Sequence, residues 1–140
     1  MRIVTNSTAE TESLGESLAA RLKGGEVLAL FGPMGMGKTA FTRGLARGLG
    51  VQGGVSSPTF ALVHEHAGKI PLYHFDMFRV TSWDDLYSTG FFDYLESDGV
   101  LVIEWSENIE GALPENAVRI TVSPGETVNQ RVFQIEGFAE

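Results

Sequence analysis

The chain has 140 residues, no cysteine and a formal net charge of −8 at pH 7, which excludes disulfides and thiolate chemistry and argues against independent tight binding of tRNA or DNA. Its hydrophobic content of 43% is that of a soluble globular protein. No apolar run approaches the roughly 18 residues of a membrane span, and the N-terminus lacks the apolar core of a signal peptide. We therefore expect residues 1–140 to form one cytoplasmic domain with no membrane partner.

The first predicted elements are a short strand and a helix. Residues 2–5 are a strand candidate, and Ser7 and Glu10 have the spacing of a capping box, in which both side chains satisfy N–H groups at the start of a helix. Apolar residues then recur at every fourth position, on one helical face: Leu14, Leu18 and Leu22. Gly24-Gly25 predicts the end of this helix.

The next segment, Gly32 to Thr39, reads G-P-M-G-M-G-K-T and matches the phosphate-binding pattern G-x-x-x-x-G-K-[ST]. It follows the apolar run Val27–Phe31, a predicted buried parallel strand, and precedes a predicted helix over Thr39–Leu49. In such a loop the backbone N–H groups and the helix N-terminus face the phosphates. Lys38 would meet the β- and γ-phosphates, and the Thr39 hydroxyl would ligate Mg²⁺. The alternative interpretation of the whole segment is an ordinary glycine-rich turn between a strand and a helix.

A hairpin is predicted in the middle of the chain. Residues 55–59 form a constrained polar segment that leads into a strand over Phe60–Glu65, and a tight turn at Ala67-Gly68 joins it to an antiparallel strand over Lys69–Phe75. These strands carry three histidines: His64, His66 and His74. Since neither cysteine nor a further ligand at metal spacing accompanies them, exposed strand histidines are favoured over a zinc site.

The C-terminal half mixes helical and strand patterns. A helical stretch is predicted from Ser82 to Leu95, a buried strand over Val100–Ile103, and a hairpin from residues 118–122 and 131–136. The helical stretch carries four aromatic residues expected in the core: Trp83, Phe91, Phe92 and Tyr94. Together the segments predict an α/β fold of three layers, the P-loop NTPase type, with central parallel strands and antiparallel strands at the sheet edges.

Two carboxylates are placed to complete a nucleotide site. Glu104 ends the run V-L-V-I-E and Asp76 ends L-Y-H-F-D, and ligands of open α/β sheets bind at the carboxyl ends of strands. Glu104 suits a Mg²⁺ ligand, and Asp76, on the same strand face as His74, suits a group that positions or deprotonates water. The alternatives are a strand-capping carboxylate and a turn aspartate. Which of the two acts on water stays open.

Two absences favour ATP and disfavour a kinase. The chain has no N-K-x-D motif of the kind that reads guanine in Ras-like GTPases, so ATP is the expected nucleotide. Its seven arginines are scattered and no basic insertion is large enough for a lid, so a small-molecule kinase is the weaker interpretation. Water or a partner protein is therefore expected to meet the bound nucleotide.

Four motifs together resemble a known family. The phosphate loop is followed by V-S-S-P-T-F at 55–60, H-F-D-M-F-R at 74–79 and I-E-W at 103–105, in the order and spacing of the bacterial tRNA threonylcarbamoyladenosine biosynthesis ATPases, TsaE. The resemblance covers roughly residues 7–122. It implies a slow ATPase that works with a complex of two proteins, TsaB and TsaD, contacts tRNA only through them, and does not itself transfer the threonylcarbamoyl group.

By position, the resemblance implies the roles of individual residues. Lys38, Asp76 and Glu104 would be catalytic, and Thr39 and Glu104 would hold Mg²⁺. Ser57-Pro58-Thr59 looks like a switch segment that senses the γ-phosphate, and Thr11 is expected near the base. The implied nucleotide-binding residues are Thr11, Gly32, Gly35, Met36, Gly37, Lys38, Thr39, Ala40, Thr59 and Trp105.

The loop departs from the family pattern at four positions: Pro33, Met34, Met36 and Ala40. Ala40 stands where the family usually has a second hydroxyl, and a lost charge-assisted hydrogen bond costs about 1.5–3 kcal/mol, so weaker nucleotide binding is expected. The leading hypothesis is an ATP hydrolase that is slow alone, because no arginine finger is evident. The alternative is a nucleotide-dependent binding switch that does not hydrolyse ATP.

Overall fold

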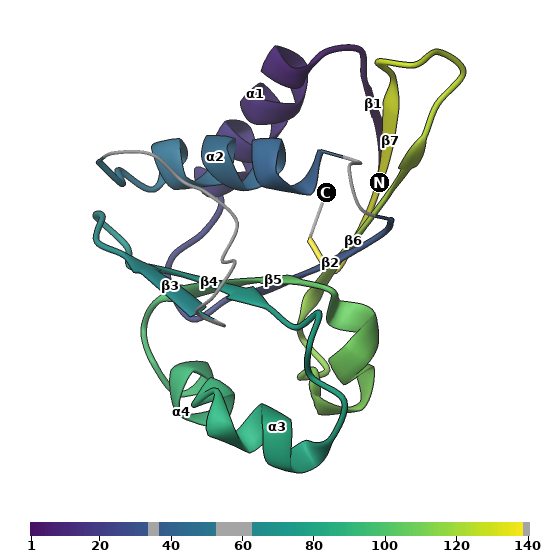
Figure 1. Cartoon of the computed structure of the whole chain (residues 1–140). Helices are drawn as coiled ribbons and strands as arrows, with labels where there is room; N and C mark the ends of the chain where they lie inside the picture. The colour runs from purple at the N-terminus through teal and green to yellow at the C-terminus, as the bar shows by residue number, and fades with distance from the viewer. Residues whose placement is uncertain (34–36, 53–62, 139–140) are drawn as a thin grey trace.

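The computed structural model describes residues 1–33, 37–52 and 63–138. Its centre is a seven-stranded sheet with the order β1-β7-β6-β2-β5-β4-β3 (Figure 1). The strands are β1 (Arg2–Thr5), β2 (Val27–Phe31), β3 (Val63–His66), β4 (Leu72–Asp76), β5 (Val100–Glu104), β6 (Val118–Pro124) and β7 (Arg131–Glu136).

The sheet has a parallel centre and antiparallel edges, which confirms the expected arrangement. Strands β6, β2, β5 and β4 run parallel to one another, whereas β7 and β1 add antiparallel on one side and β3 on the other. The central strand β2 is the apolar run expected there, and Leu28, Ala29 and Leu30 are fully buried. Because a parallel strand inside a three-layer fold is covered on both faces, such a continuous apolar run is required.

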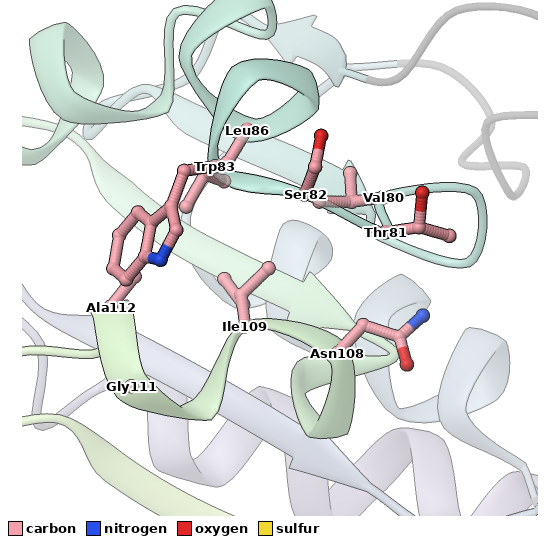
Figure 2. A pocket seen from close by; sticks show the side chains of 9 residues that line it. All are labelled: Val80, Thr81, Ser82, Trp83, Leu86, Asn108, Ile109, Gly111 and Ala112. Atoms are coloured by element: carbon pink, nitrogen blue, oxygen red, sulfur yellow. The ribbon is translucent and has the colours of Figure 1, made fainter.

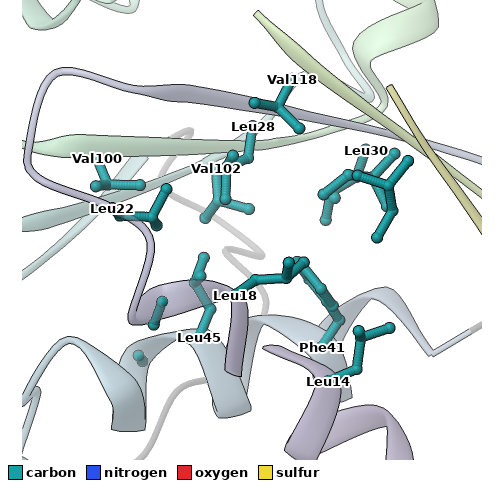
Figure 3. Packing of buried hydrophobic residues seen from close by; sticks show 14 of the residues in the cluster. Leu14, Leu18, Leu22, Leu28, Leu30, Phe41, Leu45, Val100, Val102 and Val118 are labelled. Atoms are coloured by element: carbon teal, nitrogen blue, oxygen red, sulfur yellow. The ribbon is translucent and has the colours of Figure 1, made fainter. Parts of the chain in front are cut away.

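Helices cover both faces of the sheet (Figure 1). On one face lie α1 (Thr8–Ala19) and α2 (Lys38–Gly48), and on the other α3 (Trp83–Ser88), α4 (Phe91–Leu95) and the 3₁₀ helix η1 (Ser106–Ala112). Figure 3 shows the first core, in which Leu18 of α1 and Phe41 and Leu45 of α2 face the sheet. Within the described ranges no helix is long and apolar enough to span a bilayer.

The α1 and α2 helices cross at glycines, and this close approach fixes the position of α2. A Cβ at Gly44 would lie 1.8 Å from the carbonyl oxygen of Glu12, and one at Gly15 would lie 2.2 Å from that of Phe41. Two guanidinium groups of α2 also reach an α1 carboxylate: Arg43 lies 3.6 Å from Glu12 and Arg47 lies 3.1 Å from it. The helix that begins at the phosphate loop is thus held tightly from above.

A second core lies beneath the sheet and orders the α3–α4–η1 side. Phe75 of β4 and Ile103 of β5 are fully buried there beside Phe91 of α4, whose ring centroid is 5.6 Å from that of Phe75. Alternation along β4 and β5 then sends the intervening residues, including His74 and Glu104, to the opposite face, where α2 begins.

Helix boundaries differ from expectation in two places. α1 begins with the expected serine cap, since the Glu10 N–H donates to Ser7 Oγ at 3.1 Å, but the Glu10 carboxylate accepts from the Asn6 N–H, one residue earlier than in a regular capping box. The helix also ends at Ala19, before the glycines at 24–25. The predicted single stretch over 82–95 is two short helices, because Gly90 adopts a left-handed φ of 78° between them.

Strand ends and one aromatic position also need correction. β4 begins at Leu72, three residues later than expected, so the connection from β3 is longer than a tight two-residue turn. The expected first strand of this hairpin is described only from Val63, and residues 60–62 lie outside the described ranges. Trp83, expected in the core, is 58% exposed, because it begins a helix of six residues that buries only Leu86.

Candidate functional site

The candidate site lies at the carboxyl edge of the parallel strands. β2, β5 and β4 are neighbours and point the same way, so the loop after β2 and the last residues of β4 and β5 meet at this edge. Asp76 and Glu104 are register partners at the ends of their strands. The two carboxylates singled out from the sequence are therefore adjacent, at the edge where open α/β sheets bind ligands.

The first glycine of the phosphate loop cannot be replaced without strain. Gly32 has a φ of 131°, and a Cβ there would lie 2.4 Å from the carbonyl oxygen of Val122 on β6. Gly37, also left-handed with a φ of 89°, directly precedes α2, so the N–H groups at the start of α2 open toward the loop. Gly35 and Met36 of the predicted nucleotide-binding set, with Met34, lie outside the described residues.

Lys38 is buried at the start of α2, with only 5% of its surface exposed. Its Nζ donates to the Gly32 carbonyl oxygen at 2.8 Å and lies 4.9 Å from the centre of the Trp105 ring. A buried ammonium is costly unless it is hydrogen-bonded. Here the carbonyl and the aromatic face satisfy it and keep its charge inside the loop.

Glu104 is paired with a histidine, which corrects one expectation. His74 is fully buried, not exposed, and its Nε2 lies 2.7 Å from Oε2 of Glu104, which is 7% exposed. The two side chains thus share a buried hydrogen bond across neighbouring strands. The other ring nitrogen, Nδ1, has no hydrogen-bond partner among the described residues. His74 therefore fixes the orientation of Glu104.

Asp76 is half-buried and shapes the chain that follows β4. Its Oδ1 accepts from the Phe78 N–H at 2.9 Å, which is the turn contact considered as the alternative from the sequence. The N–H of Met77, which lies between Asp76 and Phe78, donates to the Glu104 carbonyl oxygen at 3.1 Å. The end of β4 is thus tied to β5, and the carboxylate of Asp76 stays at the site edge.

Trp105 closes one side of the site in a strained conformation. Its φ of 59° makes it the one non-glycine residue with a left-handed backbone in the described part of the chain. Such a conformation costs about 1–3 kcal/mol and persists only where the surroundings impose it. The ring packs on Phe78, with centroids 4.9 Å apart, and on the Lys38 ammonium.

Two residues of η1 complete the site, and the sequence offered no signal for them. Glu107 Oε2 accepts from the Gly32 N–H at 3.1 Å, across 75 residues of sequence. Asn108 Nδ2 donates to the carbonyl oxygens of Met77 and Phe78 at 2.8 and 3.2 Å. Neither residue belongs to a periodic or spaced pattern, so only the folded chain shows that η1 joins the phosphate loop to the end of β4.

The remaining members of the predicted set are placed as follows. Thr11 of α1 is buried, shares a 2.8 Å hydrogen bond with the hydroxyl of Thr5, and has its methyl group beside Gly37. Thr39 is half-buried and Ala40 is buried at the start of α2. Thr59, with the rest of the expected switch segment, lies outside the described residues. Thr11 thus adjoins the loop, and its expected contact with the base stays a prediction.

The donor groups at this edge fit a hard cation. A hydroxyl at Thr39 and the carboxylates of Asp76 and Glu104 are oxygen donors of the kind that Mg²⁺ prefers. Across the residues described, no three His, Cys, Asp or Glu side chains gather as a metal-binding group.

Comparisons with known proteins agree on one family. The family model "Threonylcarbamoyl adenosine biosynthesis protein TsaE" matches residues 5–133. The chain is 39% identical over 122 residues to a tRNA threonylcarbamoyladenosine biosynthesis protein TsaE of Treponema pallidum, covering 87% of this chain and 90% of that protein. The Bacillus subtilis protein of the same name is 40% identical over 114 residues, covering 81% and 71%.

A solved structure shows the same fold. The crystal structure of Bacillus subtilis YdiB superimposes with a TM-score of 0.76 at 32% identity, covering 95% of this chain and 82% of that one. The chain therefore has the P-loop NTPase-like fold expected from its sequence.

Proposed function

Because the chain belongs to the TsaE family, we propose that it is an ATP-binding, slowly hydrolysing accessory protein of tRNA N6-threonylcarbamoyladenosine modification. In this proposal it acts with a TsaB–TsaD complex, contacts tRNA only through that complex and does not transfer the threonylcarbamoyl group. The observation that carries the proposal is the buried Lys38, whose Nζ donates to the Gly32 carbonyl oxygen, while Glu104 ends β5, the strand that pairs with β2 in the sheet.

The residues at the sheet edge would divide the work of holding Mg²⁺·ATP. The N–H groups at the start of α2 and the Lys38 ammonium would bind the phosphates, and Thr39 and Glu104 would hold the cation. Bound Mg²⁺ would neutralise charge on the β- and γ-phosphates. Asp76 would orient the attacking water, and His74 would keep Glu104 in place through its 2.7 Å hydrogen bond.

Slow hydrolysis by the isolated chain is supported by where its arginines are engaged. Arg43 and Arg47 of α2 pair with carboxylates of α1, and Arg119 of β6 pairs with Glu110. These three guanidinium groups are thus each engaged by a carboxylate of the same chain. Since an arginine that reaches the transferring phosphoryl group is worth about 10³–10⁵ in rate, and these three arginines are engaged elsewhere, we expect hydrolysis to stay slow until a partner contributes.

The test combines nucleotide binding with hydrolysis. We expect the full chain to bind a fluorescent ATP analogue in a Mg²⁺-dependent manner, Lys38→Ala to abolish that binding, and hydrolysis to rise when purified TsaB–TsaD is added. Lys69→Ala is the matched control, because Lys69 is an exposed lysine in the β3–β4 connection. Fast hydrolysis by the isolated chain together with no association with TsaB–TsaD would overturn the proposal.

A switch that does not depend on hydrolysis is the second candidate, and the turn at Asp76 favours it. One carboxylate oxygen of Asp76 is already engaged by the Phe78 N–H at 2.9 Å, so the side chain has a structural role at this edge. Asp76→Ala separates the two functions: if hydrolysis is lost while nucleotide-dependent partner binding survives, nucleotide binding alone drives the function.

A further inference from the structure

A hollow opens between α3 and η1, on the side of the sheet away from α1 and α2 (Figure 2). Its volume is about 200 Å³, and its lining combines apolar residues (Val80, Trp83, Leu86, Ile109 and Ala112) with polar ones (Thr81, Ser82 and Asn108). Sites for drug-sized ligands usually measure about 300–1,000 Å³. The α3–η1 groove is therefore too small for a nucleotide and has the size of a site for one large side chain.

Large apolar side chains are exposed around this groove. Trp83 lines it and is 58% exposed, and Tyr87, four residues on along α3 and hence on the same helical face, is 63% exposed. Phe78, whose carbonyl oxygen bonds the groove residue Asn108, is 51% exposed. Scattered apolar residues on a surface need no explanation. Of these three side chains Trp83 lines the groove itself, whereas the Phe78 ring packs on Trp105 and the Tyr87 ring packs on Phe92 of α4.

The segment that builds this face carries charge of one sign only. Between Val80 and Val118 there is no lysine, arginine or histidine, yet half of the 18 acidic residues fall there. They are Asp84, Asp85, Asp93, Glu96, Asp98, Glu104, Glu107, Glu110 and Glu115. Asp84 is exposed beside Trp83 at the start of α3, whereas Glu110 is paired with Arg119 of β6. Glu104 lies on the other face of the sheet beside His74, and the exposed Arg79 directly precedes the groove residue Val80. The two elements that wall the groove, α3 and η1, carry four carboxylates (Asp84, Asp85, Glu107 and Glu110) and no lysine, arginine or histidine, which favours cationic groups there.

We propose that the α3–η1 groove docks a basic segment of a partner protein, which inserts one large apolar side chain between Trp83 and Ile109 while its lysines or arginines face the acidic rim. The net charge of −8 disfavours a second copy of this chain or a nucleic acid as occupant. The proposal deepens the proposed function and rests on it in one respect, that the protein works with a partner.

The groove also adjoins the nucleotide site. Asn108, on its wall, holds the carbonyl oxygens of Met77 and Phe78, and Met77 directly follows Asp76. The neighbouring Glu107 bonds the first glycine of the phosphate loop. A segment bound in the groove would thus contact the same 3₁₀ helix that braces the loop and the end of β4.

Selection from a library of random 12-residue peptides displayed on phage tests the chemistry of the groove without assuming the partner. The folded full-length chain is the target. We expect enriched peptides to share one large apolar residue flanked by lysine or arginine. Synthetic copies should bind Trp83→Ala/Tyr87→Ala at least tenfold more weakly than the unaltered chain. Binding should also weaken with added salt and in Asp84→Asn, because screening and charge removal both reduce the attraction.

Val128→Ala is the matched control, since Val128 is 84% exposed on the β6–β7 hairpin and distant in sequence from the groove. Thermal unfolding and ATP binding of each variant should match those of the unaltered chain. Peptides without basic residues, or equal binding to the double variant, would overturn the proposal. The proposal would also be overturned if the unaltered chain self-associated or bound tRNA and the double variant did not. A groove that selects basic peptides in a chain that ignores TsaB–TsaD would contradict only the proposed partner.

Discussion

Replacing His74 with leucine tests whether this histidine positions Glu104 for a cation. The change places an apolar side chain of similar size in a fully buried position. It removes the ring nitrogen Nε2, which lies 2.7 Å from Oε2 of Glu104. A hydrogen bond to a charged group contributes about 1.5–3 kcal/mol, so the free energy of unfolding should fall by about that amount. Loss of the residue that orients a metal-binding carboxylate typically costs about 10–100-fold in metal affinity.

The assay separates a positioning role from a general loss of structure. Titration of a fluorescent ATP analogue with Mg²⁺ should show the apparent Kd for Mg²⁺ raised about 10–100-fold in His74→Leu. Binding in the presence of a chelator should be unchanged. His74→Gln retains an N–H donor and should recover part of the loss. His66→Leu is the control, because His66 is half-buried on the edge strand β3, where its register partner is Leu72 and not a residue of the site.

One result would refute this reasoning. If His74→Leu is folded and its Mg²⁺ titration coincides with that of the unaltered chain, the hydrogen bond to Glu104 does not position a cation ligand. An equal loss of binding with and without Mg²⁺ would likewise assign His74 to the packing of β4 against β5 and not to the cation.

Two further changes test the packing and the charge balance of the fold. Gly44→Ala should lower the free energy of unfolding, measured by chemical denaturation, by roughly 2 kcal/mol. The added Cβ would lie 1.8 Å from the Glu12 carbonyl oxygen, and this overpacking outweighs a gain of about 1 kcal/mol in helix propensity. Gly111→Ala is the control and should leave the free energy of unfolding unchanged, because the space around Gly111 is open. Hydrogen bonds from the backbone and side chain of Thr81 lower the pKa of Asp85, so Asp85→Asn should destabilise the fold at pH 7. Since a lowered pKa gives stability that is lost as pH falls through it, the difference should shrink during acid denaturation and vanish below the lowered pKa. A constant difference at all pH values would contradict the assignment.

The sequence was sufficient for the parts of the fold where one strong pattern acts alone. The apolar runs at 27–31 and 100–103 could only be buried strands, and both lie in the parallel centre of the sheet. The phosphate-loop pattern and the carboxylates at strand ends then predicted which edge holds the site. Parallel register brings Asp76 and Glu104 together because both end their strands at the same level.

The errors arose where tertiary contacts override local pattern. Nothing in L-Y-H-F-D distinguishes an exposed histidine from a buried one, since the pairing of His74 depends on Glu104 thirty residues later. Trp83 was expected in the core by residue type, yet a helix of only six residues buries Leu86 and leaves the indole outside. The Glu107 contact with Gly32 spans 75 residues and has no local signature.

These contacts make η1 the link between the two faces of the sheet. Lys38, His74 and Glu104 lie on the α2 side, where the phosphate loop ends, whereas the α3–η1 groove opens on the opposite side. Two consecutive residues of η1 reach both regions, Glu107 through the Gly32 N–H and Asn108 through the chain after Asp76. A shift of η1 caused by an occupant of the groove would therefore change the loop and the end of β4 together. We therefore expect Glu107 and Asn108 to contribute to any coupling between partner docking and the nucleotide, because networks of hydrogen bonds and packed side chains carry such coupling.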